Sequence, residues 1–426
     1  MVPPKKKISD LFKLPYRAAF LGWLAVVLIY NPSISWASDL IPTPVNFGLD
    51  TMAPDGSWAV RLEQRSNSWD SKYDNNGHLL DIDAPFNNLN LNANIFPSLA
   101  LLGSTASLGT TQFNTQSSTQ ISILTVGYGL SPDVTIGAII PYGFTKNSSN
   151  FAVSDGNVGF NPLFNSSNAI GPTNFPFAPV GHGISAIGSV GVQQILTNPA
   201  FGYQYKPIKK SQRAGFSDPT FGILWRAYKT NQDSLILGLG LRLGVAKNDD
   251  PDDLLDVPLG DGSTDIRTRL EYFRDIGANF DLRILADYNI QTADKATLRM
   301  PKIGEVLALN SSKEKFRRDL GDFYETDLEL GYRYLDWRFS TTWHRYEKQS
   351  DHYRSSLGND TASIEANTYT YANQYRVGAT WSGVSAWQQG KLPLPLIVKL
   401  EMQDTYGGKN FVDVRDFTLQ VTMLLK

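Results

Sequence analysis

Residues 324–344 read YETDLELGYRYLDWRFSTTWH, and apolar and polar side chains alternate along most of this stretch. Leu328 and Leu330 fall on one face of an extended chain, whereas Asp327 and Glu329 fall on the other. Successive side chains of a β-strand point to opposite faces, so a period of two indicates a strand between two different environments. The alternation breaks for two residues in the middle and then resumes. The stretch therefore predicts two antiparallel strands joined by a tight turn, each with one apolar and one polar face.

The same period of two recurs along the rest of the chain and defines twelve candidate strands. Their apolar positions are mostly Leu, Val, Ile and Phe, with Tyr or Trp often near the ends of a segment. The twelve segments are 58–62, 124–130, 134–142, 221–227, 235–245, 266–272, 280–288, 324–334, 337–343, 369–381, 396–402 and 417–425.

The connections between these segments alternate in length. Those after even-numbered segments are short, except for the Gly/Pro-rich stretch 382–395. The connections after odd-numbered segments span 66–118, 143–217, 247–263, 291–322, 348–366 and a shorter stretch near 405–413. Short turns at one end and long loops at the other are typical of outer-membrane barrels, and an even strand count places both termini on the periplasmic side.

We therefore predict an all-β fold: a transmembrane antiparallel β-barrel of about 12 strands, with long extracellular loops and short periplasmic turns. Terminal Tyr and Trp residues resemble the aromatic girdles of barrels in lipid. In lipid the strands must close, because an open sheet edge leaves backbone groups unpaired. A soluble β-sandwich, which would bury the apolar faces, is the alternative. The chain ends in Leu424-Leu425-Lys426 rather than in the aromatic residue that ends many such barrels.

The composition of the 426-residue chain excludes several other classes. The absence of cysteine excludes a disulfide scaffold, a thiolate metal site and a cysteine nucleophile. A mean hydropathy of −0.24 excludes a bundle of membrane-spanning helices. Residues 1–37 combine five bases and one acid, an apolar run at 18–30 and Ser35-Trp36-Ala37, which together predict a cleaved signal peptide rather than a membrane anchor. Removing its net charge of +4 changes the chain from −2 to −6, which indicates no nucleic-acid partner.

Three short motifs resemble those of one known family. Residues 128–137 read YGLSPDVTIG, residues 215–222 read GFSDPTFG, and residues 259–265 read LGDGSTD. They resemble the second-hairpin signature, a Gly-x-x-Asp strand start and a Gly-x-Gly-Ser strand start of the outer-membrane family named for the meta-cleavage pathway of phenol degradation. The similarity runs loosely over 120–425. It implies a barrel channel for hydrophobic or aromatic compounds, although a similar fold does not by itself define a substrate.

The charged side chains that alternate with the apolar ones are predicted to line the lumen. Twelve strands enclose a narrow interior. The whole predicted inner face holds eleven bases and nine acids, which nearly balance, so strong ion selectivity is not expected. Any one of these charges could instead pair across strands and stiffen the wall. The predicted lumen-lining residues are Arg61, Glu63, Arg226, Arg242, Arg267, Arg269, Glu271, Arg283, Glu325, Asp327, Glu329, Arg333, Arg338, His344, Arg376, Lys399 and Glu401.

Two long segments are almost free of charge. Residues 84–132 contain no charged residue, and residues 147–205 contain only Asp155. We predict that the loops within them, at about 84–118 and 143–217, fold over or into the barrel mouth and build an apolar site. A subunit contact or surface cap is the alternative, because large apolar patches often bind partners. The phenylalanines predicted for this site are Phe86, Phe96, Phe151, Phe160, Phe164, Phe175 and Phe177.

Groups that could support catalysis or metal binding are sparse. The four histidines are His78, His182, His344 and His352. A lipase-type site would pair His344 with Ser340 or Thr342, and a protease at the rim would use His352 with Asp351, but neither spacing is diagnostic. No catalytic residue is therefore predicted. The aspartates of 249–261 could hold Ca²⁺ through hard oxygen ligands, but their irregular spacing favours a solvated acidic loop, so no metal and no cofactor are predicted.

The sequence thus predicts a signal peptide over 1–37 and an outer-membrane β-barrel over 38–426. We expect the barrel to lie in a bacterial outer membrane and to admit small hydrophobic or aromatic molecules by passive diffusion, with lipid and solute as its partners. A barrel hydrolase and a structural or adhesive barrel that binds a partner through its loops are the alternatives.

Overall fold

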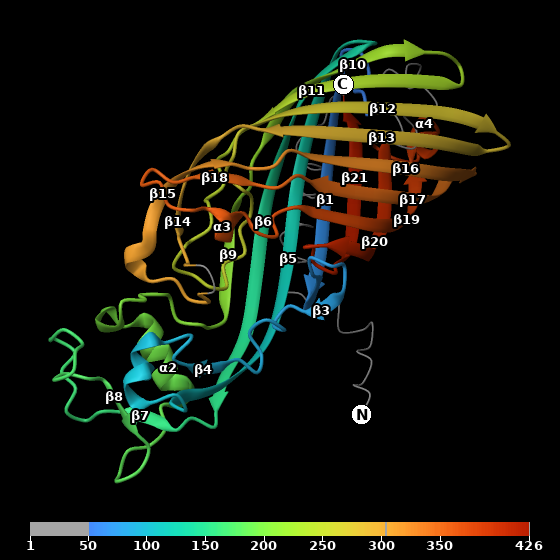
Figure 1. Cartoon of the computed structure of the whole chain (residues 1–426). Coiled ribbons are helices and arrows are strands. Elements are labelled where there is room, and N and C mark those ends of the chain that lie inside the picture. Colours follow the sequence, from blue (N-terminus) through green and yellow to red (C-terminus); the bar gives the residue numbers. More distant parts are fainter. Residues whose placement is uncertain (1–50, 303–304, 426) are drawn as a thin grey trace, which may run out of the picture. The chain divides into compact units, whose positions relative to one another are not determined.

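Twelve strands form a closed antiparallel barrel (Figure 1). The computed structural model describes residues 51–302 and 305–425, so the predicted signal peptide lies outside the described residues. No helix among the described residues is long and apolar enough to cross a membrane. The barrel strands are β1 (Trp58–Trp69), β5 (Ser107–Ser131), β6 (Val134–Ser154), β10 (Thr220–Lys229), β11 (Asp233–Arg242), β12 (Asp265–Gly277), β13 (Phe280–Gln291), β16 (Phe323–Tyr334), β17 (Trp337–Lys348), β19 (Thr370–Ser382), β20 (Leu396–Lys409) and β21 (Arg415–Leu425).

The ring closes because β1 pairs with β21 on one side and with β5 on the other. Leu62 of β1 lies opposite Val421 of β21 on one side and opposite Leu124 of β5 on the other. β6 pairs with β5 and with β10, which completes the ring. Each predicted segment overlaps one of these twelve strands, so the predicted all-β barrel and its strand number are confirmed.

The outer face of the barrel is apolar and exposed, and the inner face is polar and buried. On β16, Leu328 and Leu330 are 47% and 42% exposed, whereas Glu329 between them is 3% exposed. Tyr334 and Trp337 extend the exposed apolar surface to the turn between β16 and β17. A soluble sandwich would bury the leucines and expose the carboxylate, so the observed pattern is that of a wall in contact with lipid.

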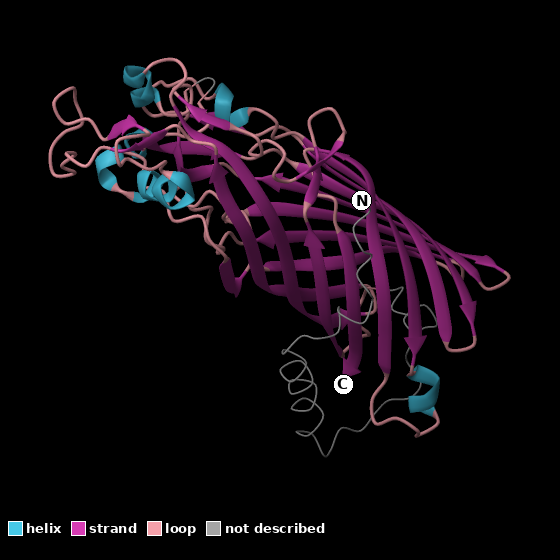
Figure 2. Cartoon of the chain, turned by 90° about the horizontal axis from the view of Figure 1, so that it is seen from below, coloured by secondary structure: helices cyan, strands magenta, loops and turns pink. Residues whose placement is uncertain are grey.

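The short turns lie at one end of the barrel, as the connection lengths predict. Ala278 and Asn279 join β12 to β13 with positive φ angles of 50° and 69°, and Leu335 in the next such turn has a φ of 53°. The longer connection between β19 and β20 contains the helix α4 (Val384–Gln388). Figure 2 shows one helix at this end and the other helical segments gathered beyond the opposite, long-loop end.

The hairpin of β5 and β6 is much longer than the rest of the wall. These strands contain 25 and 21 residues, whereas the other ten contain 10 to 14. Their distal halves carry a small subdomain beyond the barrel (Figure 1). Its elements are β4 (Asn90–Asn92), the 3-10 helices η3 (Pro97–Leu102) and η4 (Pro199–Phe201), β7 (Val158–Phe160), β8 (Phe177–Pro179) and the helix α2 (Gly188–Thr197).

The subdomain has an apolar core of its own. Val192, Ile195 and Leu196 follow the spacing of one helical face, and α2 buries them against Leu99 and Phe177. The second uncharged segment thus contains a helix at Gly188–Thr197. Both uncharged segments contribute to this core, so they pack on each other at the end of the long hairpin.

Further short elements cover the long-loop end. The strands β14 (Asp294–Arg299), β15 (Lys313–Asp319) and β18 (His352–Arg354) form a three-stranded sheet. The strand β9 (Ser211–Phe216) pairs with β6 next to the residues of β6 that pair with β10, and on the side of the long loops. It therefore extends the position of β10 in the sheet. The remaining elements are β2 (Ser71–Tyr73), β3 (Leu79–Asp81), the 3-10 helix η5 (Asn310–Ser312) and α3 (Ala362–Glu365).

Candidate functional site

Ion pairs cross the inner face of the barrel from β11 to β20. At their centre, Arg338 of β17 donates to Asp281 of β13 and to Glu329 of β16, at 2.6 Å each. The three side chains are at most 4% exposed. A side chain at Gly331 would overlap the Arg338 guanidinium, which explains the glycine at this position of β16. These charges are buried but paired, so they brace the wall and are not free binding groups.

Most of the predicted lumen-lining charges belong to this network. Each carboxylate of the network pairs with one or two basic side chains. Arg242 pairs with Asp261 (2.7 Å) and with Asp265; Asp287 pairs with Arg267 (2.8 Å) and Arg269 (2.7 Å); and Glu271 pairs with Arg283 (3.1 Å). Arg333 pairs with Asp275 (2.7 Å) and Asp281 (3.4 Å). Asp327 pairs with His344 (2.6 Å) and Arg376 (3.1 Å), and Glu401 pairs with Arg376 (3.1 Å) and Lys399 (2.5 Å).

The strand register places the remaining predicted residues on the same inner face. Arg61 and Glu63 lie on β1, and Glu325 lies on β16. Arg226 lies at the periplasmic end of β10, where its Nη1 donates to the carbonyl oxygen of Pro132 at 3.1 Å. Whether any of these side chains contacts a passing solute stays a prediction.

The wall opposite the ion pairs carries no charge on its inner face. In the ring, β5 and β6 lie opposite β16 and β17. Along β6 the inner positions run from Thr135 through Gly137 and Ile139 to Gly143 and Thr145, and β5 presents a similar series. Threonine and glycine are small and neutral. The lumen therefore has one charged, braced side and one narrow uncharged side.

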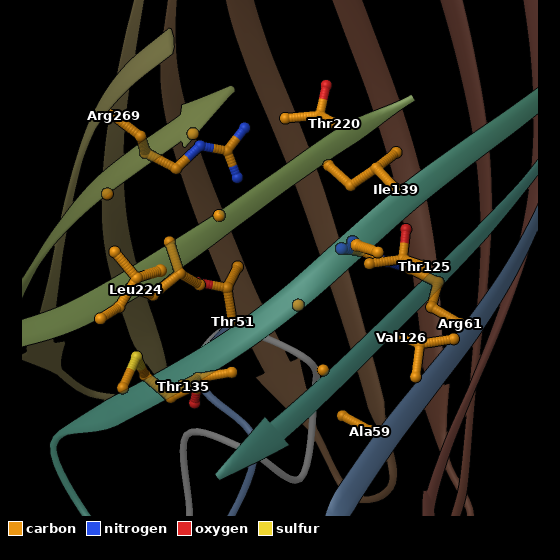
Figure 3. Close-up of a pocket in the computed structure, with 18 of the residues that line it drawn as sticks. Thr51, Ala59, Arg61, Thr125, Val126, Thr135, Ile139, Thr220, Leu224 and Arg269 are labelled. Atoms are coloured by element: carbon orange, nitrogen blue, oxygen red, sulfur yellow. The ribbon is translucent and has the colours of Figure 1, made fainter. Parts of the chain in front are cut away.

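An inner cavity of about 150 Å³ lies against the uncharged side (Figure 3). Thr125, Ile139, Thr220 and Leu224 line it from β5, β6 and β10, and the arginines Arg61, Arg267 and Arg269 line its other side. A side chain larger than glycine at position 222 would meet the backbone of β11. The cavity thus depends on small residues on three adjacent strands.

The chain just before β1 lies within the periplasmic part of the lumen. The amide of Ala53 donates to Thr135 Oγ1 at 3.0 Å, and Thr51 Oγ1 donates to Glu271 Oε2 at 3.3 Å. Met52 and Ala53 are at most 3% exposed, and Thr51 and Met52 line the inner cavity. This segment narrows the lumen on the periplasmic side of the cavity.

A second, outer cavity of about 250 Å³ lies beyond the barrel strands, where the long hairpin begins. Its base is formed by Trp69 of β1, Ser117 of β5 and Asn147 of β6. Ser117 lies opposite both Trp69 and Asn147 in the strand register. These residues continue the inner faces of their strands, so the outer cavity lies above the uncharged side of the lumen.

The predicted phenylalanines separate into two groups. Phe86, Phe96 and Phe151 line the outer cavity. Phe160, Phe175 and Phe177 pack in or against the core of the subdomain, and Phe164 packs beside Phe201 with ring centroids 5.9 Å apart. The second group lies among the distal elements of the long hairpin, so its immediate role there is packing.

The connection between β11 and β12 folds into the barrel mouth between the two cavities. Asp218 accepts hydrogen bonds from the amides of Val245, Ala246 and Gly262 at 2.9, 2.8 and 3.2 Å, which fixes both ends of this connection. Leu259 near its end lies against β6, because its Cδ2 would lie 2.6 Å from a Cβ at Gly143.

Leu259 thus covers the uncharged wall between the cavities. Gly143 lies between Ile139, which lines the inner cavity, and Asn147, which lines the outer one. Gly215, opposite Gly143 on β9, would bring a Cβ within 3.5 Å of Leu259 Cδ1. The two glycines form the depression that receives the leucine side chain.

Four aspartates of 249–261 form separate ion pairs, namely Asp250, Asp252, Asp256 and Asp261. Asp250 binds Lys206 at 2.6 Å, and this contact lowers the pKa of the Asp250 carboxyl. Burial raises the pKa of Asp252, but contacts with Lys313 and Arg299 lower it by more. Within 51–302 and 305–425, no group of three histidines or acidic residues is placed to hold a metal ion.

The histidines show no nucleophile in contact. His344 is 7% exposed and its Nδ1 lies 2.6 Å from Asp327, but in the described part of the chain no serine or threonine hydroxyl bonds to it. The side chain of His352 is 75% exposed and lies 3.8 Å from Glu365. His78 pairs with Asp74, and His182 lies in a turn with a φ of 49°. These arrangements do not assemble the predicted alternative of a hydrolase.

Three residues of the site were not singled out from the sequence. Asp218 and Leu259 fall inside motifs that were noted only as a resemblance, and Asn147 marks the start of an uncharged segment. Their roles depend on contacts between residues 27 to 116 positions apart in the chain, which spacing alone does not reveal. The one sequence feature that pointed to this part of the site was the absence of charged residues over 84–132.

The fold agrees with a solved outer-membrane channel. The chain is similar to the crystal structure of an outer membrane channel from Pseudomonas putida F1, with a TM-score of 0.50, 12% identity, and coverage of 92% of this chain and 100% of that chain. That likeness shows the fold. A scan against protein-family models gave no match, and neither did a search of curated proteins.

Other solved barrels are more distant. The toluene transporter TbuX of Ralstonia pickettii has a TM-score of 0.34 at 9% identity, with coverage of 87% of this chain and 90% of that chain. The transport unit of the autotransporter AIDA-I from Escherichia coli has a TM-score of 0.37 at 8% identity, with coverage of 86% and 90%. Likeness at this level includes barrels with different roles and supports no assignment of function.

Proposed function

We propose that this protein is a channel of the bacterial outer membrane through which small hydrophobic or aromatic molecules diffuse passively. The observation that carries the proposal is the lumen itself, in which a cavity lies against a wall without charges. An apolar solute passing there displaces little bound water, whereas the charged wall opposite is already neutralised by its own pairs.

Two further observations support this proposal. The outer cavity is lined mainly by apolar side chains, among them Phe86, Phe96 and Leu91, and lies above the same uncharged wall. The chain also shares its fold with a solved outer membrane channel, and its motifs resemble the family named for the meta-cleavage pathway. Membership of that family, cleavage of residues 1–37, and lipid and apolar solutes as partners are parts of the proposal. We propose no reaction and no cofactor for the barrel.

The proposal can be tested by dye uptake in cells, because intact lipopolysaccharide excludes apolar dyes. The full chain is produced in a Gram-negative host, and uptake of 1-N-phenylnaphthylamine is followed by its fluorescence. Ile139 faces the inner cavity, whereas Ile140, its neighbour on β6, has the opposite orientation. We expect I139W to slow dye uptake because an indole fills the cavity, and I140W to leave it unchanged because that side chain faces lipid.

Liposome swelling with sugars provides the second readout, and we expect sugars to pass slowly through the wild-type protein. Equal dye uptake with and without the protein would contradict the channel. Dye uptake that is the same in I139W, I140W and the wild type would place the route outside the inner cavity. Heat-dependent migration on gels reports whether each variant has formed its barrel.

A further inference from the structure

The outer cavity is large enough for a molecule rather than for water alone. Apolar cavities on the order of 150 Å³ hold one benzene ring, and the outer cavity measures about 250 Å³. It is lined by several separate parts of the chain, among them those that contain Phe86, Phe113, Val192 and Leu255. The volume therefore suits a ring with a short alkyl chain, or two fused rings.

A buried hydrogen-bond acceptor at the base of this cavity has no donor. Asn147 is 6% exposed, and its Nδ2 donates to the carbonyl oxygen of Leu255 at 2.9 Å. This bond fixes the orientation of the amide, since the reverse orientation would bring two oxygens together. Among the described residues, nothing donates to Asn147 Oδ1. An unmet buried acceptor destabilises the protein, so a ligand that brings a donor to it is favoured.

The two carboxylates that line the cavity are already occupied. Asp83 is 8% exposed and accepts from the amide of Thr115 at 2.5 Å. Both carboxylate oxygens of Asp256 accept from Arg213 Nη1 at 3.0 Å. No lysine or arginine lines the cavity within the described ranges. A carboxylate ligand would face Asp83 without a cation of its own, so an anion is disfavoured.

We propose that the outer cavity binds a neutral apolar molecule carrying one hydroxyl group, such as a phenol or an alcohol, whose O–H donates to Asn147 Oδ1. The apolar body lies among the phenylalanines, and the hydroxyl lies at the base, above the uncharged wall of the lumen. As a capture site for the channel, this site rests on the proposed function. The binding of a ligand to this cavity does not rest on the proposed function, because binding can be measured without transport.

The experiment measures equilibrium binding to the full-length protein in lipid nanodiscs, with empty nanodiscs as the partition blank. The probes are 2-naphthol, naphthalene and 2-naphthoate, which share one ring system and differ in the polar group. We expect wild-type protein to bind 2-naphthol more tightly than naphthalene, and naphthoate least. N147L should weaken 2-naphthol binding about two- to tenfold, to the level of naphthalene, because it removes one hydrogen bond.

Two other variants keep the test decisive. Asn150 is exposed on the opposite face of β6, so N150L should leave all three affinities unchanged. Val192 lies on α2 outside the barrel ring, so V192W should fill the cavity and weaken both neutral probes while the barrel still forms. Unchanged 2-naphthol binding in N147L, or tighter binding of naphthoate, would overturn the proposal. Binding without dye uptake would refute the channel alone, and dye uptake without binding would refute the capture site alone.

Discussion

Arg338 is the residue on which the braced wall depends most. It holds two buried carboxylates at once, and Arg333 is the other cation near Asp281, at 3.4 Å. Removing one partner of a buried pair leaves a charge without compensation, which typically costs about 3–5 kcal/mol. We therefore expect R338M to lower the free energy of unfolding by about 3–5 kcal/mol, measured by urea unfolding in phospholipid vesicles.

An exposed ion pair provides the control for this variant. Arg415 binds Asp404 at 2.7 Å, but its side chain is 59% exposed, so solvent screens the pair. R415M should change the free energy of unfolding by about 0–1 kcal/mol. Equal unfolding midpoints for R338M and R415M would show that the lumen charges are solvated and do not brace the wall.

Glu314 of β15 holds the loop 355–359 outside the barrel. Its carboxylate accepts from the hydroxyl of Ser355 at 2.7 Å, and from the Leu357 amide and the Asn359 side chain at 3.1 and 2.9 Å. The Ser355 hydroxyl and these other donors lower the pKa of Glu314 from 4.5 to about 2. A lowered carboxyl pKa stabilises the folded loop above the unfolded value and ceases to do so as pH falls through the folded one.

We therefore expect the loop to stay ordered at pH 4.5 and to loosen as the pH falls toward about 2. Hydrogen exchange of the Leu357 amide, corrected for the intrinsic rate at each pH, measures this. E314Q should exchange faster at neutral pH because it weakens the accepting group, whereas D360N, at the exposed residue that follows the loop, should not. Protection of Leu357 that does not vary with pH in the wild type would contradict the role of Glu314.

At the scale of elements, the connection between β11 and β12 is the part most suited to control passage. Leu259 lies over Gly143 between the two cavities, and Asp218 fixes the ends of the connection. L259A should open a path along the uncharged wall and raise the single-channel conductance in planar bilayers. L163A is the control, because Leu163 is 87% exposed on a distal loop of the long hairpin. A conductance that is the same in both variants would place the constriction elsewhere.

The strands could be predicted from the sequence because lipid and lumen impose opposite demands on neighbouring residues. On β16, Leu328 and Glu329 differ sharply, and the period of two is plain. The distal halves of β5 and β6 lack this contrast, since neither face meets lipid and their residues are mostly Ser, Thr, Asn and Gln. Residues 107–118 and 143–154 therefore read as loop, although they continue the strands.

The candidate site was less predictable than the strands. Alternation assigns charged residues to the inner face, but it does not show which of them pair across strands. It also does not show that the uncharged strands β5 and β6 face the charged β16 and β17, because ring order depends on closure. The uncharged loops did indicate an apolar site, yet only Phe86, Phe96 and Phe151 of the predicted phenylalanines line the outer cavity.

At the scale of the whole barrel, the distribution of exposed leucines indicates its depth in the membrane. Leu328 lies in the middle of β16 and is 47% exposed, whereas Leu335 lies in the periplasmic turn and is 80% exposed. An arginine facing lipid costs about 2–4 kcal/mol at the midplane of a bilayer and about 0–1 kcal/mol near its surface. We expect L328R to lose about 2–4 kcal/mol of folding free energy in vesicles, and L335R to lose about 0–1 kcal/mol.

The comparison uses the same substitution at two exposed leucines, so side-chain size and charge cancel and only depth differs. If the barrel spans a bilayer with β16 crossing its midplane, L328R must be the less stable variant, although Leu335 is the more exposed in water. A soluble barrel would give the reverse or no difference, since an exposed arginine in water costs little at either position. The order of the two unfolding midpoints therefore tests directly whether the apolar outer face contacts lipid.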